Sequence, residues 1–292
     1  MKHNIPISFE LFPPNTDEGL YQLSRVCDQF SLFNPDYFSV TFGAGGGNRD
    51  KTFRTVAMLL NKQVMTAPHL SCIGLSKESV RDILHTYIES GITRMVAIRG
   101  DLPATPETIA GDFQHADEFI QFIRQETGDH FHISVAAYPE FHPQSKHVFI
   151  GLQNFHRKVK AGADVAITQY FFNPDAYSYF LDSCYKMDIR IPIIPGIMPI
   201  INLEKLLRFS NLCGAEVPAW LRKRLETYTH DEVSLQAFGV DVITKLCEDL
   251  IKIGAPGLHF YTLNKFDPTQ SILKNLSFLP TQTEKNVNVV VA

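Results

Sequence analysis

Polar side chains that could react or bind a ligand stand at the ends of about eight apolar runs along this chain. These run-end residues are Glu10, Thr41, His69, Arg99, Asp101, Tyr138, Glu140, His142, Gln169, Pro199 and Tyr261. Each run is rich in β-branched or aromatic residues, and a helix-like segment follows it. Parallel strands place their carboxyl ends at one edge, so in a single sheet these side chains would meet at one mouth. The pattern therefore predicts an enzyme.

Glu10 is the first candidate for acid–base chemistry. It lies between Phe9 and Leu11, among apolar neighbours. Desolvation there would raise the pKa of the carboxyl group toward neutrality, which suits a general acid. The alternative role is a structural ion-pair partner. The other polar strand ends favour the catalytic interpretation.

Two groups of residues could hold an anion. Arg99 could bind a phosphate, and Asp101 could accept hydrogen bonds from a heterocycle, while Gly100 permits close backbone approach. Asn154, Arg157 and Lys158 have the i, i+3, i+4 spacing of one helical face, which suits a diphosphate. A surface ion pair and a solvated polar face are the respective alternatives.

Three further motifs limit the chemistry. Gln169 offers a neutral bidentate amide that suits a ring amide edge. Glu140 and His142 could bind a metal, but no HExxH or paired HxH at a strand end supports this, and we predict no catalytic metal. The glycine-rich segment 43–48 fits neither a dinucleotide nor a Walker loop, which predicts a flexible loop at the mouth.

The elements that must position these residues alternate regularly. Strands are expected over residues 7–12, 37–41, 66–72, 94–99, 131–138, 164–170, 191–197 and 258–263. Helices are expected between them, with Ser76 as one cap, one helix over 145–161 and two or three helices in 202–253. Eight strand–helix units spaced about 25–35 residues apart favour a closed (β/α)₈ TIM barrel over a doubly wound sheet.

Composition narrows the class of protein further. The chain has 292 residues, 45% of them apolar, and a net charge of −4, which excludes a general basic surface for nucleic acid or anionic lipid. It has no long apolar run for a membrane span and no signal-peptide pattern at its start. Five scattered cysteines fit a reducing cytoplasm. We expect one catalytic barrel over residues 1–278 and a C-terminal tail over 279–292, mobile or at a subunit contact.

Nine motifs together resemble one known family. The chain is similar to methylenetetrahydrofolate reductases of the bacterial catalytic-domain type from about Ile7 to Asn264. The motifs, in the family's order, are SFELFPP, SVTFGAGG, APHLSC, AIRGDLP, SVAAYPEFHP, NFHRKVKAGAD, AITQYFF, IIPGIMP and HFYTLN.

This resemblance implies an activity. Enzymes of the family are FAD-containing barrels that reduce 5,10-methylenetetrahydrofolate to 5-methyltetrahydrofolate with NADH or NADPH. The reaction is ping-pong, with hydride passing through the flavin, and it supplies one-carbon units for methionine synthesis. The resemblance also implies a homo-oligomer.

The resemblance further assigns roles to residues. Glu10 is the general acid that opens the folate ring to its N5 iminium, Asp101 tunes the flavin and stabilises that cation, and Gln169 orients the pterin. Leu203, Lys265 and Thr41 fall among the substrate-binding positions. The FAD-contacting positions are Thr41, Phe42, Ala44, His69, Arg99, Gly100, Asp101, Ala110, Tyr138, His142, Asn154, Arg157 and Lys158.

Three residues depart from the family pattern. Leu203 replaces a common Phe, Ile109 a common Tyr and Lys265 a common Arg. Leucine cannot stack like an aromatic ring, and lysine lacks the planar fork of arginine, so substrate affinity and nucleotide preference are the properties affected. Two other functions stay open from the residues: a flavin barrel that oxidises a proline-like substrate, and a barrel that binds a folate or nucleotide without catalysis.

Overall fold

The computed structural model describes residues 5–42, 49–100, 111–140, 142, 145 and 147–278. Several sequence predictions lie outside these described residues. They are the glycine-rich loop 43–48 with Ala44, the site residues Asp101 and Ala110, the departure at Ile109 and the tail 279–292.

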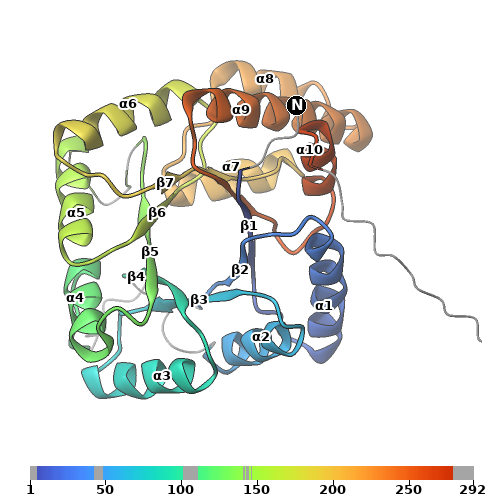
Figure 1. Ribbon diagram of the computed structural model, residues 1–292. Helices are drawn as coiled ribbons and strands as arrows, with labels where there is room; N and C mark the ends of the chain where they lie inside the picture. Colours follow the sequence, from blue (N-terminus) through green and yellow to red (C-terminus); the bar gives the residue numbers. More distant parts are fainter. Residues whose placement is uncertain are drawn as a thin grey trace, which may run out of the picture.

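Strands and helices alternate along the described chain (Figure 1). The strands are β1 (Ile7–Leu11), β2 (Tyr37–Val40), β3 (Thr66–Ser71), β4 (Arg94–Ile98), β5 (His132–Ala137), β6 (Val165–Thr168), β7 (Ile193–Ile194), β8 (Gly196–Ile197) and β9 (Leu258–Tyr261). The helices are α1 (Asp17–Ser31), α2 (Arg49–Asn61), α3 (Lys77–Glu89), α4 (Ala116–Thr127), α5 (Val148–Lys160), α6 (Pro174–Lys186), α7 (Leu203–Cys213), α8 (Ala219–Glu226), α9 (Glu232–Ile253) and α10 (Thr269–Asn275).

All described strand pairs are parallel, and they form one sheet in the order β7-β6-β5-β4-β3-β2-β1-β9-β8. The ends of this order meet, because β7 pairs with β6 while β8 pairs with β9 and only Pro195 separates β7 from β8. The sheet is therefore a closed barrel with helices around it, which confirms the predicted (β/α)₈ fold.

Two predicted elements were wrong in detail. The single strand expected over 191–197 is the pair β7 and β8, because Pro192 and Pro195 have no N–H to give to a ladder. The carbonyl of Pro195 still accepts a bond from the His259 N–H at 3.1 Å, which keeps the barrel closed. Helix α5 begins at Val148 rather than at 145, because His147 is extended, with φ −147° and ψ 149°.

Helix starts follow the side chains that cap them. The hydroxyl of Thr16 accepts from the Gly19 N–H at the start of α1, and that of Ser76 accepts from the Ser79 N–H at the start of α3. The second contact confirms the predicted cap. Both hydroxyls satisfy backbone donors that a helix leaves without partners in its first turn.

The strands are buried on both faces, which explains their continuous apolar runs. Phe9 of β1 points outward and stacks on Phe30 of α1 with ring centroids 4.2 Å apart. Tyr37, Ala67 and Val96 belong to a separate cluster inside the barrel. Because side chains alternate along a strand, Ser8 and Glu10 face this interior. Among the described helices, none is long and apolar enough to cross a membrane.

Candidate active site

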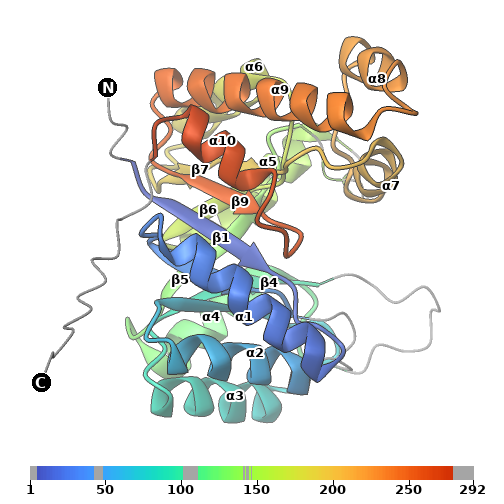
Figure 2. The ribbon, with the colours of Figure 1, turned by 90° about the vertical axis from the view of Figure 1, so that its right-hand side faces the viewer.

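The strand ends meet at one mouth of the barrel, at the edge where the arrowheads lie in Figure 2. Thr41 and Phe42 follow β2, Arg99 follows β4 and Gln169 follows β6. Barrel enzymes carry their chemistry at this edge, because loops rooted on a rigid sheet bring side chains from many strands together. The predicted convergence of the run-end residues is therefore present for the described ones.

Glu10 is a buried carboxyl group between two histidines. Its side chain is 9% exposed, and its Oε2 atom lies 3.4 Å from Nε2 of His69 and 3.7 Å from Nε2 of His259. The other ring nitrogen of His259, Nδ1, is hydrogen-bonded to Oγ of Ser8 at 2.7 Å. That bond fixes the ring so that its Nε2 edge faces Glu10.

Burial affects the protonation of His69. Burial lowers the pKa of His69. The Glu10 carboxylate raises this pKa, and His259 lowers it further. The His69 imidazole is therefore neutral at pH 7, and its contact with Glu10 is not an ion pair. No lysine or arginine among the described residues forms an ion pair with Glu10 either. The site thus places an acidic group beside the neutral His69 ring, which suits proton transfer.

Lys158 reaches from α5 toward the barrel. Its ammonium donates to the Ala136 carbonyl of β5 and lies 5.6 Å from the ring centroid of Phe155. Burial lowers its pKa to about 8, Arg99 adds a smaller effect of the same sign, and Asp117 opposes them. Within the described part of the chain Lys158 has no ion-pair partner. A desolvated cation beside a second cation is stabilised by a bound anion.

Close packing fixes the neighbouring end of β4. Gly100 has φ +88°, and a Cβ atom there would stand 1.9 Å from Oγ of Ser71 on β3. The same Ser71 hydroxyl donates to the Arg99 carbonyl at 2.9 Å. Glycine thus allows the chain to turn against β3 immediately after Arg99, which explains the Arg-Gly sequence at this point.

The other two donors predicted on α5 are placed differently. Asn154 and Arg157 are exposed, whereas Lys158 is half-buried. Lys265, after β9, is also exposed, and Leu203, at the start of α7, is half-buried. The structure therefore brings Lys158 into the barrel wall and leaves Asn154, Arg157 and Lys265 on the surface.

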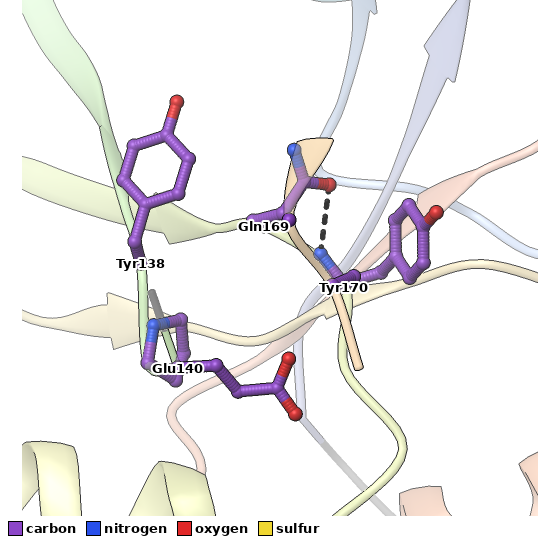
Figure 3. Close-up of a pocket in the computed structure, with 7 residues that line it drawn as sticks. Tyr138, Glu140, Gln169 and Tyr170 are labelled. Carbon is purple, nitrogen blue, oxygen red and sulfur yellow. Dashed lines mark hydrogen bonds between the residues drawn. The ribbon is translucent and has the colours of Figure 1, made fainter. Parts of the chain in front are cut away.

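Gln169 borders a small pocket between β5, β6 and the end of α7 (Figure 3). Its Oε1 accepts from the Tyr170 N–H at 3.0 Å, which orients the amide group and turns its nitrogen away from that bond. The rings of Tyr138 and His142 meet edge to face at 4.4 Å. The pocket is lined by Tyr138, Pro139, Glu140, Gln169, Tyr170, Gly214 and Ala215.

Sequence reasoning missed Ser8 and His259 as parts of the site. Both lie two residues before a polar run end on the same strand, namely Glu10 on β1 and Tyr261 on β9. The two-residue period of strands places each pair on one face. Counting back two residues from each polar run end would have identified Ser8 and His259.

A closed barrel with a buried carboxyl group and a cationic region at its carboxyl edge has the architecture of a (β/α)₈ barrel enzyme. The sequence profile of the family described as "Methylenetetrahydrofolate reductase" matches residues 1–277. The chain therefore belongs to the methylenetetrahydrofolate reductase family.

Individual relatives agree with this assignment. The 5,10-methylenetetrahydrofolate reductase of Buchnera aphidicola is 39% identical over 93% of this chain and 92% of the relative. The Escherichia coli enzyme of the same name is 36% identical over 94% of this chain and 92% of its own length. A rice protein named probable methylenetetrahydrofolate reductase (NADH) is 36% identical over 93% of this chain and 48% of the rice chain.

Solved structures share the fold. A Clostridium thermocellum protein, described as binding two copies of 5-methyl-5,6,7,8-tetrahydrofolic acid, has a TM-score of 0.62 at 17% identity. That match covers 95% of this chain and 94% of the other. A 3-dehydroquinate dehydratase from Geobacillus kaustophilus has a TM-score of 0.52 at 13% identity, over 94% of this chain and 90% of the other. At these identities the likeness concerns the fold alone.

Proposed function

We propose that this protein reduces 5,10-methylenetetrahydrofolate to 5-methyltetrahydrofolate with NADH or NADPH, in a ping-pong reaction that uses FAD. The observation that carries this proposal is the buried Glu10 carboxyl group between His69 and His259, in a chain of this family. The rice relative named for NADH makes NADH the first nucleotide to test.

In this proposal Glu10 is the general acid. Protonation of the folate N10 atom breaks its bond to the bridging methylene carbon and leaves an iminium at N5. Burial in the barrel keeps water from competing for the proton, and the Ser8–His259 hydrogen bond holds the ring that faces the carboxyl group. Gln169, Leu203, Lys265 and Thr41 are the proposed substrate-binding residues, and Asp101 completes the proposed catalytic pair.

The described residues fit a flavin dinucleotide. Lys158 is a desolvated cation near Arg99, and such a region suits a diphosphate. Tyr138 and His142 add an aromatic edge at the same side of the mouth. The flavin, when bound, supplies a carrier for two electrons between the nicotinamide and the folate. Self-association in a cytoplasmic setting is a further proposal that rests on the family resemblance.

Spectroscopy with a Glu10→Gln variant tests this function. The purified protein should show a flavin absorption band near about 450 nm that bleaches on anaerobic addition of NADH or NADPH. Glu10→Gln should bleach at the normal rate yet lose about a hundredfold or more of its folate turnover, because an amide cannot donate the required proton. Full folate turnover in the variant would refute the acid role, and absence of a flavin band after addition of FAD would refute the cofactor.

A further inference from the structure

Glu140 joins two parts of the molecule that are far apart in sequence. Its Oε2 atom accepts a hydrogen bond of 2.8 Å from the backbone N–H of Glu216. Glu140 follows β5 at the mouth, whereas Glu216 lies in the connector between α7 and α8. The proposed function uses neither residue.

Helix α7 lies beyond the arrowhead end of the barrel (Figures 1 and 2). It begins at Leu203, shortly after β8, and is 11 residues long, ending at Cys213. A helix of that length spans about 16 Å, so its far end needs anchors of its own. The connector that follows the helix forms one wall of the pocket beside Gln169, through Gly214 and Ala215.

Two polar contacts fasten this far end to the strand ends. The hydroxyl groups of Tyr170, after β6, and Ser210, on α7, are 3.0 Å apart, and Ser210 is buried. The Glu140–Glu216 bond is the second contact, and it involves a carboxyl group. The first contact holds the last turn of α7, and the second holds the connector that follows it.

The Glu140 carboxyl group is also withdrawn from water. Burial raises its pKa, with the Glu216 N–H bond acting in the opposite direction. In Figure 3 the Glu140 carboxyl group lies below Gln169 and Tyr170, and no hydrogen bond joins it to any of the residues drawn. Its bond to the Glu216 N–H therefore joins the loop after β5 to the connector after α7.

We propose that Glu140 is a positioning residue that holds α7 and its connector against the ends of β5 and β6, and so sets the folate-binding wall of the mouth. This inference rests on the proposed function. A folate extends well beyond its pterin ring, so a displaced wall lowers its affinity. Flavin reduction by a nicotinamide does not depend on folate and serves as the internal reference.

Steady-state kinetics of side-chain variants provide the test. Glu140→Ala should raise the KM for 5,10-methylenetetrahydrofolate about fivefold or more, while the rate of NADH oxidation by an artificial electron acceptor stays within about twofold of wild type. Glu140→Asp, one methylene shorter, should raise the KM in the same direction with little risk to folding. Glu140→Gln, whose amide oxygen can accept the same bond, should stay within about twofold.

Substitutions at position 216 separate the backbone bond from side-chain effects. Glu216→Ala keeps the N–H and should leave the KM unchanged, whereas Glu216→Pro removes that donor and should reproduce the effect of Glu140→Ala. An unchanged KM in both Glu140→Ala and Glu140→Asp would overturn the inference, as would equal effects of Glu216→Ala and Glu216→Pro. Failure of the proposed function is a different result, because wild type itself would then not turn over folate.

Discussion

A carboxyl group and two imidazoles meet inside the barrel although they come from β1, β3 and β9. Glu10 and His69 are 59 residues apart, and His259 is 249 residues from Glu10. Each is buried, and the ring nitrogens that face Glu10 belong to side chains fixed by strand geometry or by the Ser8 hydrogen bond. Preorganised groups of this kind need no rearrangement at the moment of proton transfer.

The Lys158 side chain should take up protons when a diphosphate binds beside it. Its pKa is about 8, below its ordinary 10.5, so near pH 8.5 a large share of its side chains are neutral. A bound diphosphate favours the ammonium form and raises that pKa, so the binding of FAD should take up protons at this pH. Calorimetric titration in two buffers with different ionisation enthalpies measures the uptake.

Two variants of α5 control this measurement. Lys158→Met should abolish the proton uptake, whereas Lys160→Met, at an exposed position, should preserve it. Proton uptake that is identical in Lys158→Met and wild type would show that another group titrates on binding.

Closure of the barrel depends on close packing between β8, β6 and β9. Gly196 of β8 has no room for a side chain, because a Cβ atom would stand 2.2 Å from the Thr168 carbonyl and 2.5 Å from the Tyr261 ring. That ring is held in place by the Tyr261 hydroxyl, which donates to the Thr168 carbonyl at 2.7 Å. The aromatic ring therefore spans the seam where the two ends of the sheet meet.

Gly196→Ala should lower the free energy of unfolding by about 2 kcal/mol, because the added methyl group must push backbone and ring apart. Urea unfolding measures the change. Gly151→Ala is the matched control, since its nearest neighbour, the Ser145 hydroxyl, is 3.7 Å away, and a helical alanine should stabilise α5 by up to about 1 kcal/mol. Equal stability of Gly196→Ala and wild type would show that the seam can relax.

The burial of the cysteine thiols shows how tightly the whole barrel is closed. All five cysteines are reduced, and four of them are buried. Burial raises the pKa of Cys27, Cys72 and Cys184 to about 12 and raises that of Cys247 as well. These thiols lie between the strands and the helices around them or within the helical layer, so a reagent reaches them only when the barrel opens.

A thiol-specific chromogenic reagent should therefore label no more than the half-buried Cys213 rapidly in the native protein, and all five cysteines in denaturant. Release of chromophore over time gives the count. Cys213→Ser should abolish the rapid native phase. Fast labelling of two or more thiols without denaturant would contradict a uniformly closed barrel.

The alternation of apolar runs and helix signals determined the barrel, and the residue at each run end located the mouth. This worked because parallel strands buried on both faces have a simple pattern, and their carboxyl ends share an edge. The sequence also predicted helix caps such as Ser76, because a cap hydroxyl accepts from a backbone N–H only three residues away.

Contacts across the sheet were decided only by the tertiary structure. The sequence alone could not show that His259 faces Glu10, or that Glu140 holds a connector 76 residues away. Each depends on register and closure, which place distant residues within a few ångströms. Local propensity and spacing carry no information about such distances, because they depend on how the whole barrel closes.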